Sequence, residues 1–171
     1  ARVLRAPFEA APVGCAWSAS AWSAAPPRAD AAQARESRDR LERFLGEAVA
    51  AYGADPARVH LLGFSQGASM ALGVALSRPD LVRSVVAHSG RLLRQLVPAA
   101  PPGGLAGLPV LLQHGRHDPV VPLAFADEAR GLLEPLGVAL TRRDYDLGHE
   151  IGAESLRDLA GWLAARLDAP R

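Results

Sequence analysis

Apolar positions along the chain recur with two different spacings, which predict two kinds of secondary structure. Strand-length stretches rich in apolar residues predict interior strands at 58–63, 81–88 and 110–113, and residues 138–145 are the last strand candidate. A further short strand is expected at 3–6, where Pro7 ends it. Stretches with apolar residues three or four positions apart predict helices at 30–52, 66–78, 122–137 and 156–167. Strands and helices that alternate in this way are typical of an α/β protein with a mainly parallel sheet.

The predicted helices differ in how much of their surface is apolar. The helix after Ser65 is apolar nearly all round, which predicts that it is buried. The first and last helices each carry one apolar stripe: Leu41, Phe44, Leu45, Ala48 and Tyr52 in the first, and Leu156, Leu159, Ala160, Leu163 and Leu167 in the last. No internal repeat or domain boundary is visible. The sequence therefore predicts one domain over 1–171, with a sheet of about five strands and helices on both faces.

The candidate chemistry is centred on the junction between the strand at 58–63 and the next helix, which reads Gly63-Phe64-Ser65-Gln66-Gly67. A serine on a tight strand-to-helix turn holds its hydroxyl clear of both elements. Gly63 and Gly67 flank the turn, where side chains would collide as the strand and the helix approach. The backbone N–H of Gln66, at the helix N-terminus, then points to where an oxyanion would form. The pattern predicts Ser65 as a nucleophile.

Two further polar residues, Asp118 and His149, lie just past the ends of predicted strands, as Ser65 does. In an open α/β sheet, reacting groups collect where the carboxyl ends of the strands meet. The chain order Ser, Asp, His is that of the α/β-hydrolase triad. A serine hydroxyl becomes a good nucleophile when an imidazole takes its proton, and an acid fixes the tautomer of that imidazole. We therefore predict Asp118 as the acid and His149 as the base.

The four other histidines are interpreted as structural. His114 directly follows a strand and is expected to form a hydrogen bond that holds the acid loop, whereas His117 is expected to be exposed. His60 alternates with the apolar positions of one strand, and His88 ends another. A metal site formed by His114, His117 and Asp118 is the alternative, but such ligands in one tight loop support it only weakly.

Composition and charge narrow the classes of function. The net charge is +1, and all 19 basic residues are Arg, so bulk electrostatics gives no indication of a nucleic-acid partner. No apolar run approaches the ~20 residues that cross a bilayer, which predicts that the chain does not span a membrane. Cys15 is the only cysteine, which favours a reducing, cytoplasmic compartment. Because the sequence has no initiator Met, we expect it to begin inside something longer or to be processed.

Three segments together resemble the phospholipase/carboxylesterase family, the α/β-hydrolase group that includes bacterial carboxylesterases and acyl-protein thioesterases. They are Gly63–Ala68, His114–Pro122 and Tyr145–Ile151, and the resemblance covers most of the chain. It implies an α/β-hydrolase fold in which Ser65 is the nucleophile, Asp118 the acid and His149 the base. It also implies hydrolysis of carboxylic esters or thioesters without a metal or another cofactor. Ala68 stands where many members carry a second Gly, a change that leaves the turn intact.

One departure from the family pattern is larger. Members usually carry an upstream strand that ends in a Leu-His-Gly-x-Gly type loop and donates the second N–H of the oxyanion hole. That strand normally lies between the strands resembling 3–6 and 58–63, and it is absent here, so the chain resembles an N-terminally truncated member. Three arrangements stay open: the sequence lacks a segment of the protein, the strand at 3–6 pairs directly with 58–63, or a second chain fills the gap.

These observations predict a serine carboxylesterase that hydrolyses small acyl esters through an acyl-enzyme intermediate. The alternatives are an acyl-protein thioesterase or lysophospholipase, and a catalytically weak remnant that binds a ligand. Substrate contacts are expected from the loops at 8–29 and 91–108, with Trp22, Leu92 and Leu93 as candidates. We expect a small-molecule acyl ester as the partner, no metal and no cofactor. A homodimer is the expected assembly if the protein is not monomeric.

Overall fold

A parallel sheet forms the centre of the structure, as the alternating pattern predicts. The computed structural model describes residues 2, 4–9, 15–18, 20–21, 28–99 and 103–167. Its main sheet consists of β5 (His60–Phe64), β6 (Ser84–His88), β7 (Pro109–Gly115) and β8 (Ala139–Tyr145). The strands lie side by side in the order β5-β6-β7-β8, and every neighbouring pair is parallel. Their carboxyl ends therefore meet at one edge of the sheet.

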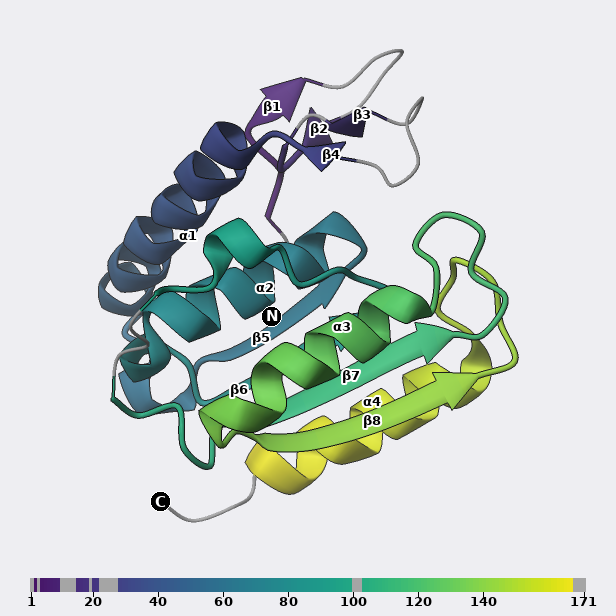
Figure 1. Ribbon diagram of the computed structural model, residues 1–171. Helices are drawn as coiled ribbons and strands as arrows, with labels where there is room; N and C mark the ends of the chain where they lie inside the picture. The colour runs from purple at the N-terminus through teal and green to yellow at the C-terminus, as the bar shows by residue number, and fades with distance from the viewer. Residues whose placement is uncertain are drawn as a thin grey trace.

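Helices cover both faces of this sheet, which confirms the predicted layers (Figure 1). They are α1 (Ala31–Ala51), α2 (Gln66–Ser77), α3 (Ala124–Leu133) and α4 (Ala153–Leu167). In Figure 1, α2 and α3 lie in front of the sheet and α4 lies behind it. α1 packs against α2. Each predicted helix is therefore present, on an α/β-hydrolase type of sheet.

The N-terminal segment forms two short antiparallel ladders instead of a strand of the main sheet. β1 (Phe8–Glu9) pairs with β2 (Cys15–Ala16), and β3 (Ser20–Ala21) pairs with β4 (Arg28–Ala29). Residues 4–6 adopt no strand, so the prediction of a strand at 3–6 is wrong for them, and Val3 lies outside the described residues. The apolar run there is short, and Pro7 removes the next ladder donor. The main sheet has four described strands rather than about five.

β5 is an edge strand in the described part of the chain, where its one ladder partner is β6. Direct pairing of residues 4–6 with β5 is therefore not observed. The side chain of Leu62, at the centre of β5, is 50% exposed, although its register neighbours Val86 and Leu111 are completely buried. An edge of this kind presents backbone N–H and C=O groups to any further strand.

The largest hydrophobic core lies between the sheet and the helices α2 and α3. Every residue of α2 from Ala68 to Leu76 is buried, so this helix is enclosed as its all-round apolar sequence predicts. Phe125, Ala129 and Leu133 form the buried stripe of α3. The two helices hold the carboxyl ends of β5 and β7 in fixed positions, with β6 between them.

The predicted stripes of the first and last helices are only partly correct. In α4, Leu159 is buried, but Leu156 and Leu167 are 54% and 45% exposed. A polar residue, Ser155, takes a completely buried position one turn before Leu159, because its hydroxyl has hydrogen-bond partners there. In α1 the stripe is only partly buried at Leu41 and Leu45, and Tyr52 is 58% exposed, with its ring centre 4.2 Å from the guanidinium of Arg2.

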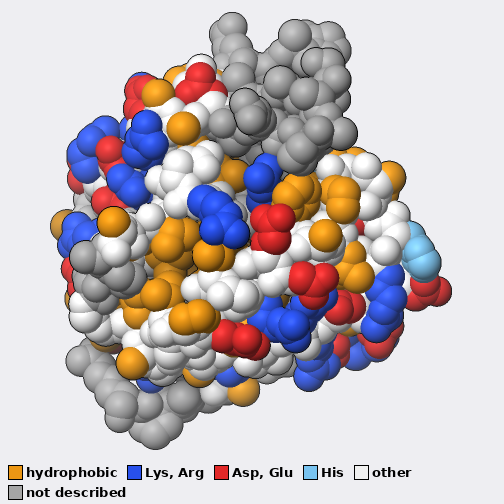
Figure 2. Space-filling model, in the orientation of Figure 1, with side chains coloured by type: hydrophobic (Ala, Val, Ile, Leu, Met, Phe, Trp, Pro, Cys, Tyr) orange, Lys and Arg blue, Asp and Glu red, His pale blue; other side chains and the backbone are white. Residues whose placement is uncertain are grey.

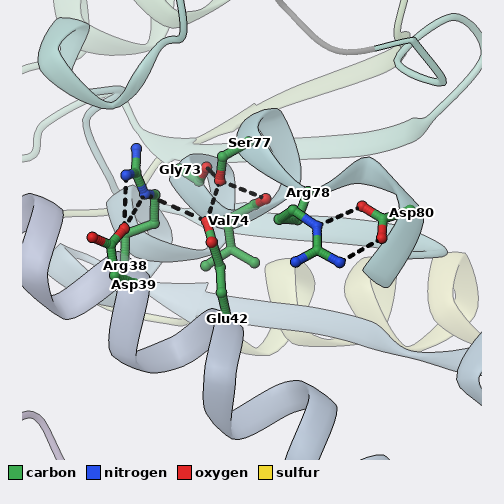
Figure 3. Close-up of polar contacts among 8 residues, drawn as sticks. All are labelled: Arg38, Asp39, Glu42, Gly73, Val74, Ser77, Arg78 and Asp80. Atoms are coloured by element: carbon green, nitrogen blue, oxygen red, sulfur yellow. Dashed lines mark hydrogen bonds and ion pairs between the residues drawn. The ribbon is translucent and has the colours of Figure 1, made fainter.

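Polar side chains join the C-terminal end of α2 to α1 (Figure 3). The hydroxyl of Ser77 hydrogen-bonds to the carboxylate of Glu42 and lies 2.9 Å from the carbonyl oxygen of Gly73. Nε of Arg38 lies 3.4 Å from the same carboxylate. Because Arg38 and Glu42 are four residues apart in α1, this pair also supports the helix. The contacts fix where α1 lies along α2.

The surface carries charges of both signs close together. Figure 2 shows arginine and acidic side chains intermixed on the face it presents, in line with the net charge of +1. One example is Arg142, whose guanidinium lies 2.6 Å from Asp127 and 3.0 Å from Asp144. Among the described residues, no helix combines the length and the hydrophobicity needed to cross a bilayer.

Candidate active site

The serine of the predicted nucleophile turn lies in a strained conformation between β5 and α2. Ser65 has a φ of 54° and a ψ of −119°, a region that residues with a side chain rarely occupy. Its backbone N–H donates to the carbonyl of His88, the last residue of β6 (2.9 Å). A Cβ on Gly63 would lie 2.2 Å from the carbonyl oxygen of Gly67, so only glycine allows the strand and the helix to approach this closely.

The structure brings the three predicted triad residues together. Nε2 of His149 lies 3.0 Å from Oγ of Ser65, and Nδ1 of His149 lies 2.7 Å from Oδ2 of Asp118. The three residues follow the carboxyl ends of β5, β7 and β8, and the loops after β7 and β8 lie at the same end of the sheet in Figure 1. One imidazole nitrogen therefore faces the hydroxyl while the other faces the carboxylate.

The Asp118 side chain is completely buried, and hydrogen bonds hold it ionised. Its Oδ1 accepts the backbone N–H groups of Val120 (2.9 Å) and Val121 (2.7 Å). Burial by itself raises the pKa of the Asp118 carboxyl, but the two N–H donors and the imidazole of His149 outweigh it and lower this pKa below its ordinary value. Because Asp118 is ionised, its Oδ2 can accept a hydrogen bond from Nδ1–H of His149.

The acid loop is fixed by two further contacts. Nε2–H of the buried His114 donates to the carbonyl of Val121 (2.7 Å), which confirms the predicted role of His114. At the end of β7, a Cβ on Gly115 would lie 2.3 Å from the carbonyl oxygen of Gly148, the residue before His149. The absence of a side chain at position 115 thus lets the acid loop and the histidine loop touch.

The histidines at positions 114 and 117 have different partners. The His117 side chain is 70% exposed, as predicted, and its Nε2 lies 2.5 Å from the carboxylate of Asp146. His114 instead points inward to Val121. In the described part of the chain, no group of three or more His, Cys, Asp or Glu side chains is placed so that it could hold a metal ion.

Gln66 contributes twice to the site. Its backbone N–H opens α2, where the first N–H groups of a helix point out of the helix end. Its side-chain amide binds the N-terminal segment: Oε1 accepts the backbone N–H of Trp17 (2.9 Å), and Nε2 donates to the carbonyl of Ser18 (3.1 Å). Trp17 packs against the hydrophobic cluster around Met70. The side chain of Gln66 thus ties residues 17–18 to the nucleophile turn.

The predicted substrate contacts are not supported by the structure. Leu92 and Leu93 are 2% and 6% exposed and belong to hydrophobic clusters, so their prediction as substrate contacts is wrong. The loop at 91–108 turns both side chains inward because they fill space beside α2. Trp22 lies outside the described residues.

Sequence reasoning missed the groups that surround the imidazole of His149. The ring of Phe64 packs at 4.8 Å from the His149 ring and at 5.7 Å from the ring of His88. His88 is completely buried and contacts the hydroxyls of Ser89 (3.0 Å) and Ser155 (3.2 Å). In the sequence, the one indication that Phe64 belongs to the site is its position next to Ser65. No local pattern marks Ser155.

The buried His88 leads to a prediction for stability. Burial, aided by repulsion from His114 and His149, lowers the pKa of His88 to about 4. In the unfolded chain the group titrates near its ordinary value of about 6.5. The unfolded state therefore binds the proton first, and the stability contribution present above pH ~6.5 is lost as the pH falls towards 4. We expect the free energy of unfolding to fall by up to about 1.4 kcal/mol per pH unit from this group.

Denaturant unfolding at a series of pH values between 7 and 4 measures this loss. A His88→Gln variant lacks the titrating group, so its stability is expected to fall less steeply over the same range. Equal slopes for the two proteins would contradict the prediction.

A parallel sheet with helices on both faces, a strained serine between strand and helix, and a histidine–carboxylate pair at neighbouring strand ends together define the class of the α/β-hydrolases. Residues 11–167 match the family model described as Phospholipase/Carboxylesterase. The chain belongs to this family.

Curated relatives include acyl-protein thioesterase 1 of Eremothecium gossypii, which is 32% identical over 139 residues, or 80% of this chain and 59% of that protein. Another is esterase YpfH of Escherichia coli, 36% identical over 98 residues, or 57% of this chain and 40% of that protein. The chain thus spans less than two thirds of the length of these relatives.

Solved structures agree on the fold. The crystal structure of esterase PE8 has a TM-score of 0.83 at 29% identity and covers 95% of this chain and 76% of its own. The crystal structure of SOBER1 from Arabidopsis thaliana has a TM-score of 0.81 at 23% identity and covers 95% and 81%. At this level of identity the SOBER1 likeness is one of fold.

Proposed function

We propose that the protein is a serine carboxylesterase that hydrolyses small acyl esters, with Ser65 as nucleophile, His149 as general base and Asp118 as the acid that orients His149. The observation that carries this proposal is the continuous chain of contacts from Ser65 Oγ to His149 Nε2 (3.0 Å) and from His149 Nδ1 to Asp118 Oδ2 (2.7 Å). Membership of the family and the esterases among its relatives support the same class of reaction.

In the proposed acylation step, Ser65 Oγ attacks the carbonyl carbon of the ester while its proton passes to Nε2 of His149. The carbonyl oxygen becomes an oxyanion, which accepts the backbone N–H of Gln66. When the tetrahedral intermediate collapses, the bond to the alcohol oxygen breaks, and that oxygen takes the proton from His149. The acyl group remains on Ser65.

Deacylation follows the same route with water in place of the alcohol. His149 takes a proton from the water as its oxygen attacks the acyl carbon, and it returns this proton to Oγ of Ser65 when the acyl bond breaks. Asp118 stays ionised in both steps and stabilises the imidazolium that forms. The products are a carboxylic acid and the regenerated hydroxyl.

The rate depends on the oxyanion donors. Gln66 supplies one backbone N–H, and the strand that brings the second donor in the family has no counterpart beside β5 in the described residues. Removing one such donor typically lowers kcat by about 10²–10³. A protein limited to this one donor is therefore expected to turn over esters slowly.

A thioesterase that acts on acylated proteins is the second candidate. The relative from Eremothecium gossypii that bears the name acyl-protein thioesterase favours it. The same triad would cleave a thioester, because the attack on the acyl carbon is unchanged and only the leaving group differs. Rates on an oxygen ester and a thioester with the same acyl group would separate the two candidates.

Labelling with a fluorophosphonate, followed by peptide mass spectrometry, tests the proposal. We expect a single adduct, on Ser65, because its hydroxyl lies within hydrogen-bond distance of an imidazole that is itself held by a carboxylate. Turnover of p-nitrophenyl acetate is expected to disappear in step with labelling. No adduct, or an adduct on another residue, would leave the non-catalytic remnant as the better reading of this chain.

A further inference from the structure

A group of polar side chains, all but one of them buried, lies between the sheet and α4, directly behind the loop that carries His149. We name it the anchoring network and define it by five residues: His88, Gln113, Tyr145, Ser155 and Asp158. His88 and Tyr145 are the last residues of β6 and β8, Gln113 lies two residues before the end of β7, and the other two lie in the first half of α4. His88 and Ser155 are completely buried, and Gln113 is 1% exposed. Polar groups buried to this degree cost free energy unless they are paired.

Ser155 fixes the end of the histidine loop. Its Oγ accepts the backbone N–H of Gly152 (3.1 Å), three residues after His149, and lies 3.1 Å from the carbonyl of Gly152. This contact caps the first turn of α4. Nε2 of His88 lies 3.2 Å from the same hydroxyl, and Nδ1 lies 3.0 Å from the hydroxyl of Ser89. A neutral imidazole satisfies both contacts when Nε2–H donates to Ser155 and Nδ1 accepts from Ser89.

Tyr145 fixes the start of the same loop. Its hydroxyl accepts Nε2–H of Gln113 (2.7 Å) and donates to the carboxylate of Asp158 in α4 (2.9 Å). Burial, together with the hydrogen bond to Asp158, raises the pKa of Tyr145 to about 12, so the hydroxyl keeps its proton. Nε2 of Gln113 also donates to the carbonyl of Ser155 (2.9 Å), which joins the two ends of the loop through one side chain.

The network also reaches the imidazole of His149 through an aromatic ring. Phe64 lies between the two histidines, with ring centroids 5.7 Å from His88 and 4.8 Å from His149. A shift of His88 would therefore move the surface on which the His149 ring rests.

The polar groups are confined to the part of the interface next to the loop. Deeper along the same strands, the contacts with α4 are apolar: Val86 and Leu111 pack against Leu159. An interface that was apolar throughout would be enough to attach α4 to the sheet, so the hydrogen bonds are not needed for attachment alone. Hydrogen bonds have directions, so they define one position of a helix end more sharply than apolar contacts do.

We propose that the anchoring network holds the loop at 146–152 in the one position that places His149 between Ser65 and Asp118, and that His88 is a positioning residue of the proposed esterase. The inference rests on the proposed function for its kinetic consequences. The position of the His149 imidazole, in contrast, can be tested without measuring turnover.

His88→Phe tests the network, because phenylalanine keeps a ring beside Phe64 but removes both hydrogen bonds of His88. Misplacing a catalytic group by about 1 Å lowers rates by up to ~10²-fold, so we expect kcat for p-nitrophenyl acetate to fall about 10- to 100-fold with KM within about twofold. His88→Gln places an amide N–H near the position of Nε2 and is expected to restore kcat to within about threefold of wild type.

Leu159→Ala is the matched control, since it weakens the same helix–sheet interface without touching the network. It is expected to lower the melting temperature and to leave kcat unchanged. If His88→Phe does not fold, Ser155→Ala removes the same hydrogen bond from the side of α4. A His88→Phe kcat within twofold of wild type, a His88→Gln variant as slow as His88→Phe, or an equal loss of kcat in Leu159→Ala would overturn the proposal.

Nitrogen-edited NMR separates failure of this proposal from failure of the proposed function. The proton on Nδ1 of His149, shared with Asp118, is expected to give a sharp downfield resonance in the wild type and in His88→Gln, and to broaden or vanish in His88→Phe. A wild type without turnover that shows this pattern would refute the esterase and support the positioning. An unchanged resonance in His88→Phe would refute the positioning, whatever the turnover.

Discussion

Replacing Ser65 by alanine is expected to lower kcat for p-nitrophenyl acetate by about 10⁶, to the background set by binding and the oxyanion donor. The variant has no hydroxyl to attack the acyl carbon, and Nε2 of His149 loses the group that lies 3.0 Å away. Alanine differs from serine by one atom, so the strained turn with its φ of 54° is retained. The effect is therefore expected in kcat and in labelling, not in folding.

Ser69→Ala provides the matched control for this prediction. Ser69 lies one turn further along α2 and is buried, at 6% exposure, without a place in the triad. Steady-state kinetics and fluorophosphonate labelling of the two variants are compared, and only Ser65→Ala is expected to lose both. A Ser65→Ala protein that keeps more than about 1% of the turnover would mean that another residue carries the reaction.

The helices and strands, and the meeting of the three site residues, could be predicted from the sequence because both depend on strong local rules. Apolar runs and helical stripes gave four strands and four helices near their observed positions. Ser65, Asp118 and His149 were found because each follows a strand of one parallel sheet, which brings their ends together without further information. His114 was found in the same way, since a residue at a strand end beside the acid can hold the acid loop.

The failures occurred where position depends on packing between distant segments. Leu92 and Leu93 were expected near the substrate because they lie in a loop from which substrate contacts were expected, yet packing beside α2 buries them. In α4, Ser155 replaces an apolar residue at a core position because its partner His88 comes from another element. The hydrophobic period of α4 alone includes the exposed Leu156 and Leu167 and misses Ser155. Contacts between elements that are distant along the chain do not affect the spacing of apolar residues within one helix, so that spacing cannot reveal them.

Replacing Asp118 by asparagine is expected to lower kcat by about 10⁴ while the protein stays folded. The asparagine Oδ1 keeps the two acceptor contacts with the N–H groups of Val120 and Val121, which turns its NH₂ towards His149. Nδ1 of His149 must then accept a hydrogen bond from this NH₂ instead of donating one to a carboxylate. The proton moves to Nε2, and an imidazole in this tautomer cannot take the proton of Ser65.

The loss is expected throughout the pH range of the assay, because Asp118 has a lowered pKa and is ionised across that range in the wild type. Asp146→Asn is the matched control: this carboxylate belongs to the same histidine loop, but its side chain is 84% exposed and pairs with His117 at the surface. Its kcat is expected to stay within about twofold of wild type, because a surface pair of this kind has little energetic weight. If Asp118→Asn and Asp146→Asn had equal kcat values, Asp118 would have no part in orienting His149, and the imidazole would depend for its position on the anchoring network alone.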